Sequence, residues 1–229
     1  MAAIDPKHKA GDNSYQEFPR GLSWLLTFFT LAILVGTVAT LITRWHSLNH
    51  WLIYLYAGLF TIYLIAENRA HTQPSETGKH THEVLRYLLT FFWWLLIAAA
   101  LFEYTLWNRS NSLVTLAGTL ISLAGIVLRV WSVSTLGRFY SGHIETWHNH
   151  SVVHDGPYKL IRHPGYTGSM LQVIGMPLVV NAYLTLIVSA ILIVLFLRRM
   201  IWEESFLVQS LPGYQDYVSH TWRIIPGIW

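Results

Sequence analysis

The chain has 229 residues, of which 53% are apolar and 12% charged, and it contains 11 tryptophans. Soluble domains carry about 25% charged residues, so this composition excludes an ordinary soluble domain and predicts an integral membrane protein. There is no cysteine, which excludes disulfides, cysteine-ligated zinc and thiol nucleophiles. The net charge of +3 is modest and does not indicate nucleic-acid binding.

Six apolar segments are long enough, or nearly so, to cross a membrane as helices, which takes about 20 residues. The polar N-terminus is followed by an apolar run too long for a signal-peptide core, so no cleaved targeting peptide is expected. Only Asn181 and Ala182 separate the last two segments, which predicts a helical hairpin over 166–197. The six expected spans are 22–42, 51–66, 87–106, 113–133, 166–180 and 183–197.

The basic residues divide unevenly between the two sides of these spans. Thirteen Lys and Arg residues fall on the side of the two termini and two on the other. The positive-inside rule therefore places both termini in the cytoplasm. We expect an all-α membrane protein of about six transmembrane helices, a single domain over 1–229. Its parts are a polar stretch 1–20, four spans within 22–133, and a cofactor-binding part 134–229. The fourth loop and the C-terminal tail of that last part form a cytoplasmic cap.

A polar motif, GPYKLIRHPGYTG, occupies residues 156–168 at the start of the fifth span. Pro164 suits the first position of a helix, where its missing N–H is not needed. The free N–H groups of that helix, with Arg162 and His163, would receive an anionic ligand group. Gly168 and the glycine three residues before it permit close approach of a backbone or a ligand. The alternative is a helix that Arg and Tyr side chains merely anchor in the headgroup layer.

The hairpin should bring a second polar group to this motif. Because its two arms have similar lengths, the chain returns to the leaflet it left, and Arg199, Glu203 and Glu204 should lie near Arg162 and His163. Adjacent carboxylates beside an apolar helix are costly unless a cation or a donor meets them. Arg199, four residues before Glu203, can be that partner. A solvated helix end with a routine ion pair is the alternative.

Histidine is frequent, at twelve residues, and four histidines crowd the fourth loop. A metal site would need a ligand pattern such as HxxxH or cysteine partners. Neither accompanies them, so we expect no metal, but solvated histidines with one or two ligand contacts. The loop histidines are His143, His148, His150 and His154.

The chemistry of the motif suits a zwitterionic cofactor with a positive centre, such as S-adenosyl-L-methionine. Its carboxylate would meet the helix start, its ammonium and ribose hydroxyls the glutamates, and its sulfonium an aromatic face. Composition and spacing alone leave this a hypothesis.

Residues 150–229 resemble the C-terminal half of the isoprenylcysteine carboxyl methyltransferase family and its bacterial and archaeal relatives. Phospholipid N-methyltransferases share the two central pieces of the pattern, whereas the first four spans resemble no family that we can name. The resemblance rests on GPY at 156–158, RHPGYTG at 162–168, Arg199 with Glu203 and Glu204, Tyr214 with Tyr217, and Arg223 with Pro226.

This resemblance implies an S-adenosyl-L-methionine-dependent carboxyl methyltransferase whose lipophilic acceptor enters sideways from the bilayer. Arg199 would orient an acceptor carboxylate, with Glu203 or Glu204 fixing the cofactor or the arginine. Six spans are fewer than in the eukaryotic enzymes, which suggests a prokaryotic-type member in the cell membrane. The acceptor is then a prenylated substrate or a small hydrophobic acid, thiol or amine. The residues implied to enclose the cofactor are His150, Val153, Gly156, Tyr158, Arg162, His163, Tyr166, Gly168, Glu203 and Glu204.

Two other classes of protein remain open. NADPH-dependent sterol or steroid reductases resemble this family in their last spans, but they usually place an acidic residue after the glycine that corresponds to Gly168. Ser169 stands there in this chain, and the cap carries few basic residues for a 2′-phosphate. A non-enzymatic membrane scaffold or transporter is the other class. Its translocation path would need paired ionisable residues in mid-span, which the sequence lacks.

Overall fold

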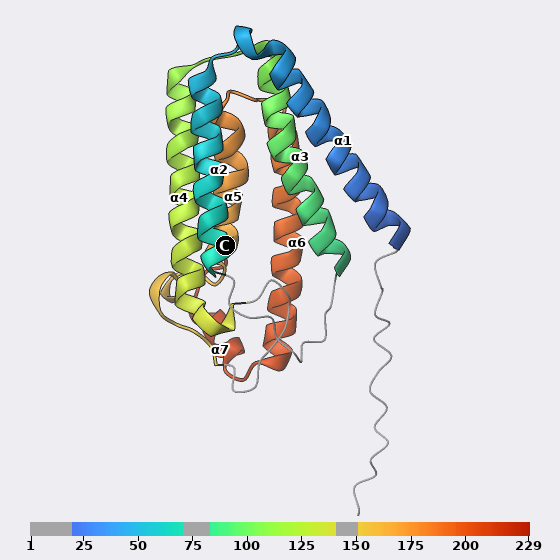
Figure 1. Ribbon diagram of the computed structural model, residues 1–229. Helices are drawn as coiled ribbons and strands as arrows, with labels where there is room; N and C mark the ends of the chain where they lie inside the picture. Colours follow the sequence, from blue (N-terminus) through green and yellow to red (C-terminus); the bar gives the residue numbers. More distant parts are fainter. Residues whose placement is uncertain (1–19, 71–82, 141–150) are drawn as a thin grey trace, which may run out of the picture.

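The computed structural model describes residues 20–70, 83–140 and 151–229, and in these ranges it consists of helices and connections without a strand (Figure 1). The all-α prediction is therefore confirmed for this part of the chain. The α-helices are α1 (Arg20–Arg44), α2 (His50–Ala70), α3 (Glu83–Trp107), α4 (Ser112–Leu136), α5 (Pro164–Val179), α6 (Leu186–Ser210) and α7 (Tyr214–His220). Short 3-10 turns are η1 (Trp45–Ser47), η2 (Gly137–Phe139) and η3 (Gly156–Lys159).

Four of these helices are long and apolar enough to cross a membrane. Within the described residues the candidate spans are Trp24–Ser47, His50–Glu67, Val84–Trp107 and Ser112–Phe139. They agree with the first four expected spans, so the chain is an integral membrane protein. α5 has only 16 residues and α6 carries charges in its last turns, so the fifth and sixth spans and the cytoplasmic cap stay predictions.

Local signals in the sequence set where the helices begin and end. α4 begins after Asn111, whose side chain accepts hydrogen bonds from the N–H groups of the first turn. α5 begins at Pro164, as its missing N–H predicts. α6 ends before Pro212, and Gly213 adopts a left-handed φ of 83° that leads into α7.

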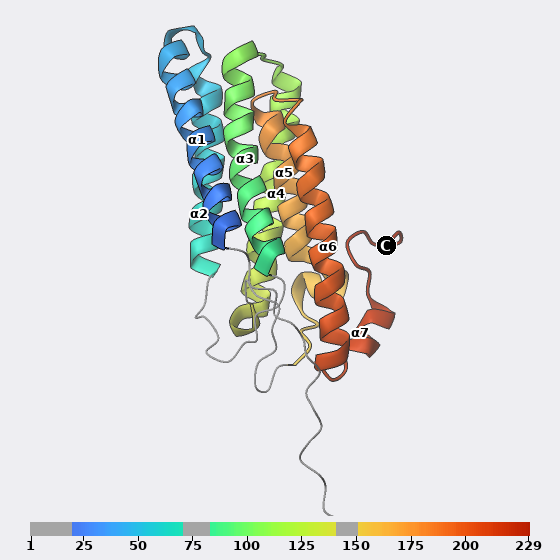
Figure 2. The ribbon, with the colours of Figure 1, turned by 90° about the vertical axis from the view of Figure 1, so that its right-hand side faces the viewer.

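α4 and α5 pack with their backbones nearly in contact, and both ribbon views show them side by side (Figures 1 and 2). A Cβ built on Gly118 would lie 2.6 Å from the amide nitrogen of Val179, and one on Gly168 would lie 2.7 Å from the carbonyl oxygen of Gly125. Small residues let helices in a membrane approach this closely. The glycines therefore fix how α5, and the motif at its start, sits against α4.

Asn181 organises the turn between α5 and α6. It adopts a left-handed φ of 57°, and its Nδ2 donates to Thr115 Oγ1 at 2.9 Å. Its Oδ1 accepts from the backbone N–H of Asn111 and the hydroxyl of Tyr183, both at 3.1 Å. The turn is thus joined to the start of α4.

Glu103, buried at the end of α3, fixes the start of α6. Its carboxylate accepts the backbone N–H groups of Leu184 at 3.0 Å and Thr185 at 2.8 Å. The Thr185 hydroxyl donates to the same carboxylate at 2.9 Å. A buried carboxylate needs such donors, so this end of the bundle sets the path along which α6 returns toward the motif.

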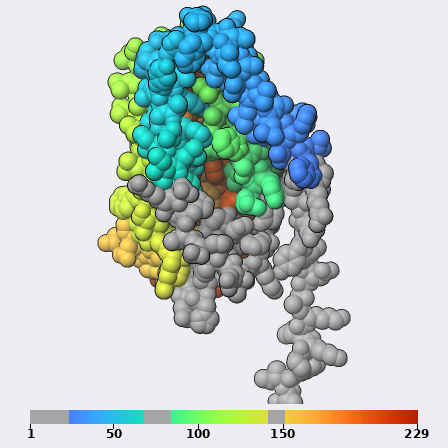
Figure 3. Space-filling model, viewed as in Figure 1, coloured from blue at the N-terminus to red at the C-terminus, as the bar shows by residue number. Residues whose placement is uncertain are grey.

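The opposite end of the bundle collects the start of α5, the last turns of α6, α7 and the tail (Figure 2). Aromatic rings join α2 to α3 through Phe60 with Trp94 and Tyr63 with Trp93. Figure 3 shows the surface hollowed between these two helices, with residues of the C-terminal part visible in its depth. The hollow faces sideways from the bundle.

Candidate active site at the end of the bundle

Arg162 joins the motif to both α6 and the C-terminal tail. Its Nε donates to Glu204 Oε1 at 2.7 Å, and its Nη1 donates to the carbonyl oxygens of Val218 at 2.9 Å and of Thr221. Arg223 Nε donates to the other oxygen of Glu204 at 2.7 Å. We call Arg162, Glu204 and Arg223 the clamp. It confirms that the hairpin brings Glu204 back to Arg162.

The backbone of the motif is also hydrogen-bonded to the tail. The N–H of Arg162 donates to the carbonyl oxygen of Trp222 at 2.7 Å, and that of His163 to the carbonyl oxygen of Arg223 at 3.1 Å. In return the N–H of Trp222 donates to the carbonyl oxygen of Leu160 at 3.1 Å. The tail therefore lies beside the motif like a short parallel strand and holds it by main-chain as well as side-chain bonds.

His163, directly before α5, is buried and has an unused nitrogen. It is 4% exposed, and its Nε2 has no hydrogen-bond partner among the described residues. Burial, together with the nearby cations Arg162 and Arg223, lowers the pKa of His163 to about 3. The imidazole is therefore neutral at physiological pH, and its Nε2 can serve a ligand.

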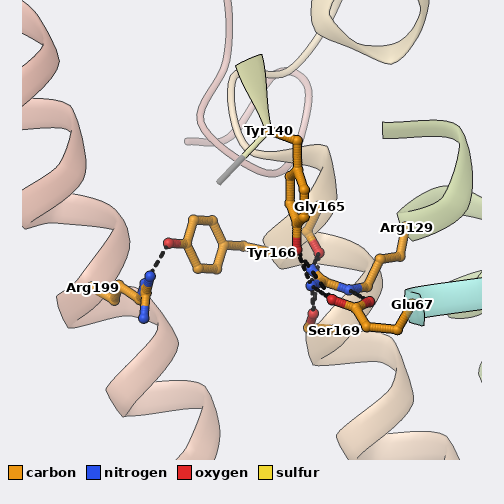
Figure 4. Close-up of polar contacts among 7 residues, drawn as sticks. All are labelled: Glu67, Arg129, Tyr140, Gly165, Tyr166, Ser169 and Arg199. Carbon is orange, nitrogen blue, oxygen red and sulfur yellow. Dashed lines mark hydrogen bonds and ion pairs between the residues drawn. The ribbon is translucent and has the colours of Figure 1, made fainter. Parts of the chain in front are cut away.

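A second group, Tyr166, Arg199 and Glu203, lies between α5 and α6, and we call it the Tyr166 cluster. The Tyr166 hydroxyl donates to Glu203 Oε2 at 2.5 Å and accepts from Arg199 Nε at 3.0 Å (Figure 4). Burial raises the pKa of Glu203, against the effect of the Tyr166 hydrogen bond and of Arg199. The expected partnership of Arg199 and Glu203 thus runs through the phenol oxygen.

A third group was not predicted from the sequence. Arg129 of α4 pairs with Glu67 of α2 through two bonds, Nε to Oε2 at 2.7 Å and Nη2 to Oε1 at 2.6 Å. Tyr140 bonds both partners, accepting from Arg129 at 2.9 Å and donating to Glu67 at 3.1 Å. Arg129 Nη1 also donates to Ser169 Oγ at 3.1 Å. We call these four residues the Glu67 cluster.

The first turn of α5 lies between the Tyr166 cluster and the Glu67 cluster. In Figure 4 the ring of Tyr166 projects toward Arg199, while the Gly165 carbonyl and Ser169 face Arg129. From sequence, Arg129 reads as a snorkelling residue and Glu67 as the flank of a short span. Two opposite charges expected at the same membrane face are the signal that could have paired them.

Tyr158 and Gly156 support the motif from η3. Tyr158 is buried, and its carbonyl oxygen accepts a hydrogen bond from the hydroxyl of Tyr217 at 2.7 Å. Gly156 has a left-handed φ of 54°, and a Cβ there would lie 2.8 Å from Thr135 Oγ1. Both residues therefore pack against protein, η3 resting on the end of α4 and on α7.

Three residues of the expected site remain. Gly168 faces Gly125 of α4, so a helix occupies the space beside it. Val153 is half-buried in the segment before η3. His150 lies outside the described residues, as do His143 and His148 of the same loop. No group of metal-ligating side chains is found within the described residues.

Comparison with known proteins finds a family that resembles the second half of the chain. Residues 116–209 match the isoprenylcysteine carboxyl methyltransferase (ICMT) family. A probable protein-S-isoprenylcysteine O-methyltransferase of Oryza sativa subsp. indica is 30% identical over 120 residues, which are 50% of this chain and 62% of that protein. Protein-S-isoprenylcysteine O-methyltransferase B of Arabidopsis thaliana is 26% identical over 114 residues, 48% of this chain and 57% of that protein.

A bacterial relative extends the similarity toward the N-terminus. The cobalt-zinc-cadmium resistance protein CzcN of Cupriavidus metallidurans is 28% identical over 154 residues, 66% of this chain and 65% of that protein. The chain thus covers less than two thirds of the length of each of these relatives. The matched stretch contains α5, most of α4 and nearly all of α6, with Arg129 and the whole Tyr166 cluster. Residues 116–209 are thus similar to the isoprenylcysteine carboxyl methyltransferase family.

Proposed function

We propose that this protein is a membrane methyltransferase that uses S-adenosyl-L-methionine to methylate a lipophilic acceptor. The observation that carries the proposal is that the stretch matching the ICMT family contains both the buried His163, whose Nε2 is unused, and the Tyr166 cluster. When bound, the cofactor supplies an electrophilic methyl group on a sulfonium.

The residues present fit such a cofactor. The neutral His163 can exchange a hydrogen bond with a ligand through Nε2, and Glu203 can accept from an ammonium or hydroxyl group. Glu204 already receives a guanidinium on each oxygen. We therefore assign cofactor binding to His163, Tyr166 and Glu203, and assign to Glu204 and Arg162 the task of holding the motif in place.

Two arginines, Arg129 and Arg199, are candidates for binding an acceptor carboxylate. The guanidinium of Arg129 is distributed over Glu67, Tyr140, the Gly165 carbonyl and Ser169. It therefore suits positioning of the first turn of α5. Arg199, whose Nε donates to the Tyr166 oxygen beside Glu203, is our candidate for orienting the acceptor. A guanidinium favours a carboxylate acceptor, and the names of the plant relatives point to an isoprenylcysteine.

The acceptor would reach this site from the bilayer. The hollow between α2 and α3 (Figure 3) opens sideways, so the apolar part of an acceptor can stay in lipid while its reactive group approaches α5. We infer that α5 and α6 are the fifth and sixth spans. We also infer that the site faces the cytoplasm, because most Lys and Arg residues lie on the side of the membrane where the site is found. Holding two reactants in register would supply much of the rate enhancement.

Binding of S-adenosylhomocysteine to the detergent-purified protein tests the proposal, with NADPH as the comparison ligand. We expect the wild type to bind S-adenosylhomocysteine, and His163→Ala and Glu203→Gln each to weaken it at least tenfold. Asp216→Asn is the matched control, because Asp216 is an exposed carboxylate on α7 and its loss should change nothing. Binding of NADPH alone would favour a reductase, and binding of neither ligand would refute both enzymes.

A further inference from the structure

We propose that residues Trp222–Trp229, the tail loop, dock into the phospholipid headgroup layer of the membrane that holds α1–α4. The docked loop would then keep the Arg162–His163 segment in place. This inference concerns a lipid-facing surface and does not depend on which cofactor or acceptor the protein uses.

The tail loop turns its apolar side chains outward. Trp222 is 44% exposed, Ile225 50%, Ile228 75% and Trp229 40%. The loop is nevertheless compact, since the N–H groups of Ile224 and Ile225 donate to the carbonyl oxygen of Trp229 at 3.0 and 3.2 Å. Burying one large apolar side chain is worth about 1.5–3 kcal/mol. A closed loop that shows four of them to solvent therefore indicates a partner surface.

The position of the loop identifies the partner. The Arg223–Glu204 ion pair attaches the tail loop to α6. Glu204 is seven residues beyond Leu197, the last residue of the apolar run. At 1.5 Å per residue this is about 10 Å along the helix. From α7 the chain turns back toward the middle of the bundle (Figure 2). The headgroup layer is roughly 5–8 Å thick on each side of the hydrocarbon. The attachment at Glu204 is therefore just outside this layer, and the turn back toward the bundle brings the loop to the depth of the headgroups.

Residue chemistry agrees with a headgroup layer. Tryptophan is enriched at membrane interfaces because its ring is apolar and its N–H is polar. The guanidinium of Arg223 lies over the Trp229 ring at 5.0 Å. Two further cations, Lys159 and Arg198, are exposed at the same end of the molecule and can meet lipid phosphates. A surface that mixes tryptophan, isoleucine and cations suits phospholipid better than it suits water.

Docking of the loop has a consequence for the motif. The carbonyl oxygens of Trp222 and Arg223 receive the N–H groups of Arg162 and His163, and Arg223 completes the clamp on Glu204. Whatever holds the loop therefore also holds the segment whose His163 Nε2 is unused. The order of the motif should depend on contact between the loop and lipid.

The depth of the loop can be measured directly, because the chain has no cysteine and a single one can be labelled. We would attach a nitroxide to Ile228→Cys in lipid nanodiscs and compare its collisions with oxygen and with a water-soluble nickel chelate. Val127→Cys, exposed on the α4 span, is the lipid control, and Asp216→Cys on α7 is the water control. Oxygen preference at Ile228 approaching that at Val127 is expected. A signal equal to that of Asp216 would overturn the proposal.

Hydrogen exchange tests the coupling without any ligand. The double substitution Ile225→Asp and Ile228→Asp should speed exchange of the Arg162 and His163 amides in nanodiscs several-fold. Val208→Asp, which alters an exposed residue of α6, should leave those amides unchanged. Unchanged exchange in the double variant would refute the coupling. If the double variant does not fold, the nitroxide measurement still decides the docking.

Discussion

The clamp and the Tyr166 cluster are built on adjacent carboxylates, Glu204 and Glu203, yet they hold them differently. Glu204 is buried and receives a guanidinium on each oxygen, from Arg162 and from Arg223. Glu203 accepts a single hydrogen bond among the described residues, from the phenol of Tyr166. One step along a helix rotates a side chain by about 100°, so neighbouring glutamates face different partners. The comparison separates a carboxylate that holds the fold from one that retains capacity for a ligand.

The largest expected effect comes from removing the charge of the clamp. Glu204→Gln leaves two guanidinium groups facing each other, and breaking a buried ion pair by removing one partner costs about 3–5 kcal/mol. We expect a loss of folding free energy in that range, measured by unfolding in mixed micelles. Glu203→Gln should lose less than about 1 kcal/mol, because only a hydrogen bond from a phenol is weakened. Equal losses in the two variants would contradict the division of roles.

The next effect concerns ligand affinity, where Glu203→Gln should have the larger effect and Glu204→Gln the smaller one. A hydrogen bond to a charged group is worth about 1.5–3 kcal/mol, so Glu203→Gln should weaken S-adenosylhomocysteine roughly 10–100-fold. Affinity for S-adenosylhomocysteine is measured by calorimetry, under conditions in which Glu204→Gln is still folded. Glu204→Gln should weaken binding less than Glu203→Gln, because it affects the ligand only indirectly, by loosening the clamp. A weakening by Glu204→Gln greater than that by Glu203→Gln would place the cofactor on the clamp instead.

Much of this arrangement could be predicted from the sequence where local rules apply. Pro164 starts α5, the break after Ser210 ends α6, and equal hairpin arms return Glu204 to Arg162. The start of α5 and the end of α6 follow from backbone chemistry, and the return of the glutamate pair to the motif follows from chain length.

The missed features depend on how segments far apart in the chain pack against each other. The partners Glu67 and Arg129 are 62 residues apart on different helices, and their meeting requires α2 and α4 to turn particular faces together. Arg223, the second cation of the clamp, belongs to a tail that no periodic pattern describes. Glu103 shows no partner in the sequence, because its donors are the backbone N–H groups of a turn. Such contacts follow from tertiary packing, of which the approach of α4 and α5 at Gly118 and Gly168 is one example, rather than from any local motif.

A smaller effect should appear as a pH dependence next to the clamp. Burial lowers the pKa of His163 to about 3, below its ordinary value near 6.5. Between these values the unfolded chain binds a proton that the folded protein does not, so stability rises with pH and is lost as pH falls below about 6.5. The slope is about 1.4 kcal/mol per pH unit at most.

The His163→Gln variant isolates this dependence. Unfolding of the ligand-free protein at pH 7 and pH 5.5 should show wild type losing more stability than His163→Gln, since glutamine does not titrate. The physical reason for the loss is that the buried imidazole loses water when it is charged, and that it then lies beside the cations Arg162 and Arg223. Identical pH profiles in the two proteins would mean that His163 becomes charged in the folded state.

The smallest expected effect is the removal of the phenol oxygen that links Arg199 to Glu203. Tyr166→Phe deletes two hydrogen bonds, but Arg199 and Glu203, four residues apart on α6, can then approach each other directly. The net cost should be about 1 kcal/mol. A double-mutant cycle with Glu203→Gln measures the coupling, which should be about 1 kcal/mol between residues in contact and near zero between Tyr166→Phe and Glu204→Gln. Coupling of Tyr166 to Glu204 as strong as to Glu203 would merge the two groups into one network, and the contrast between the adjacent glutamates would be lost.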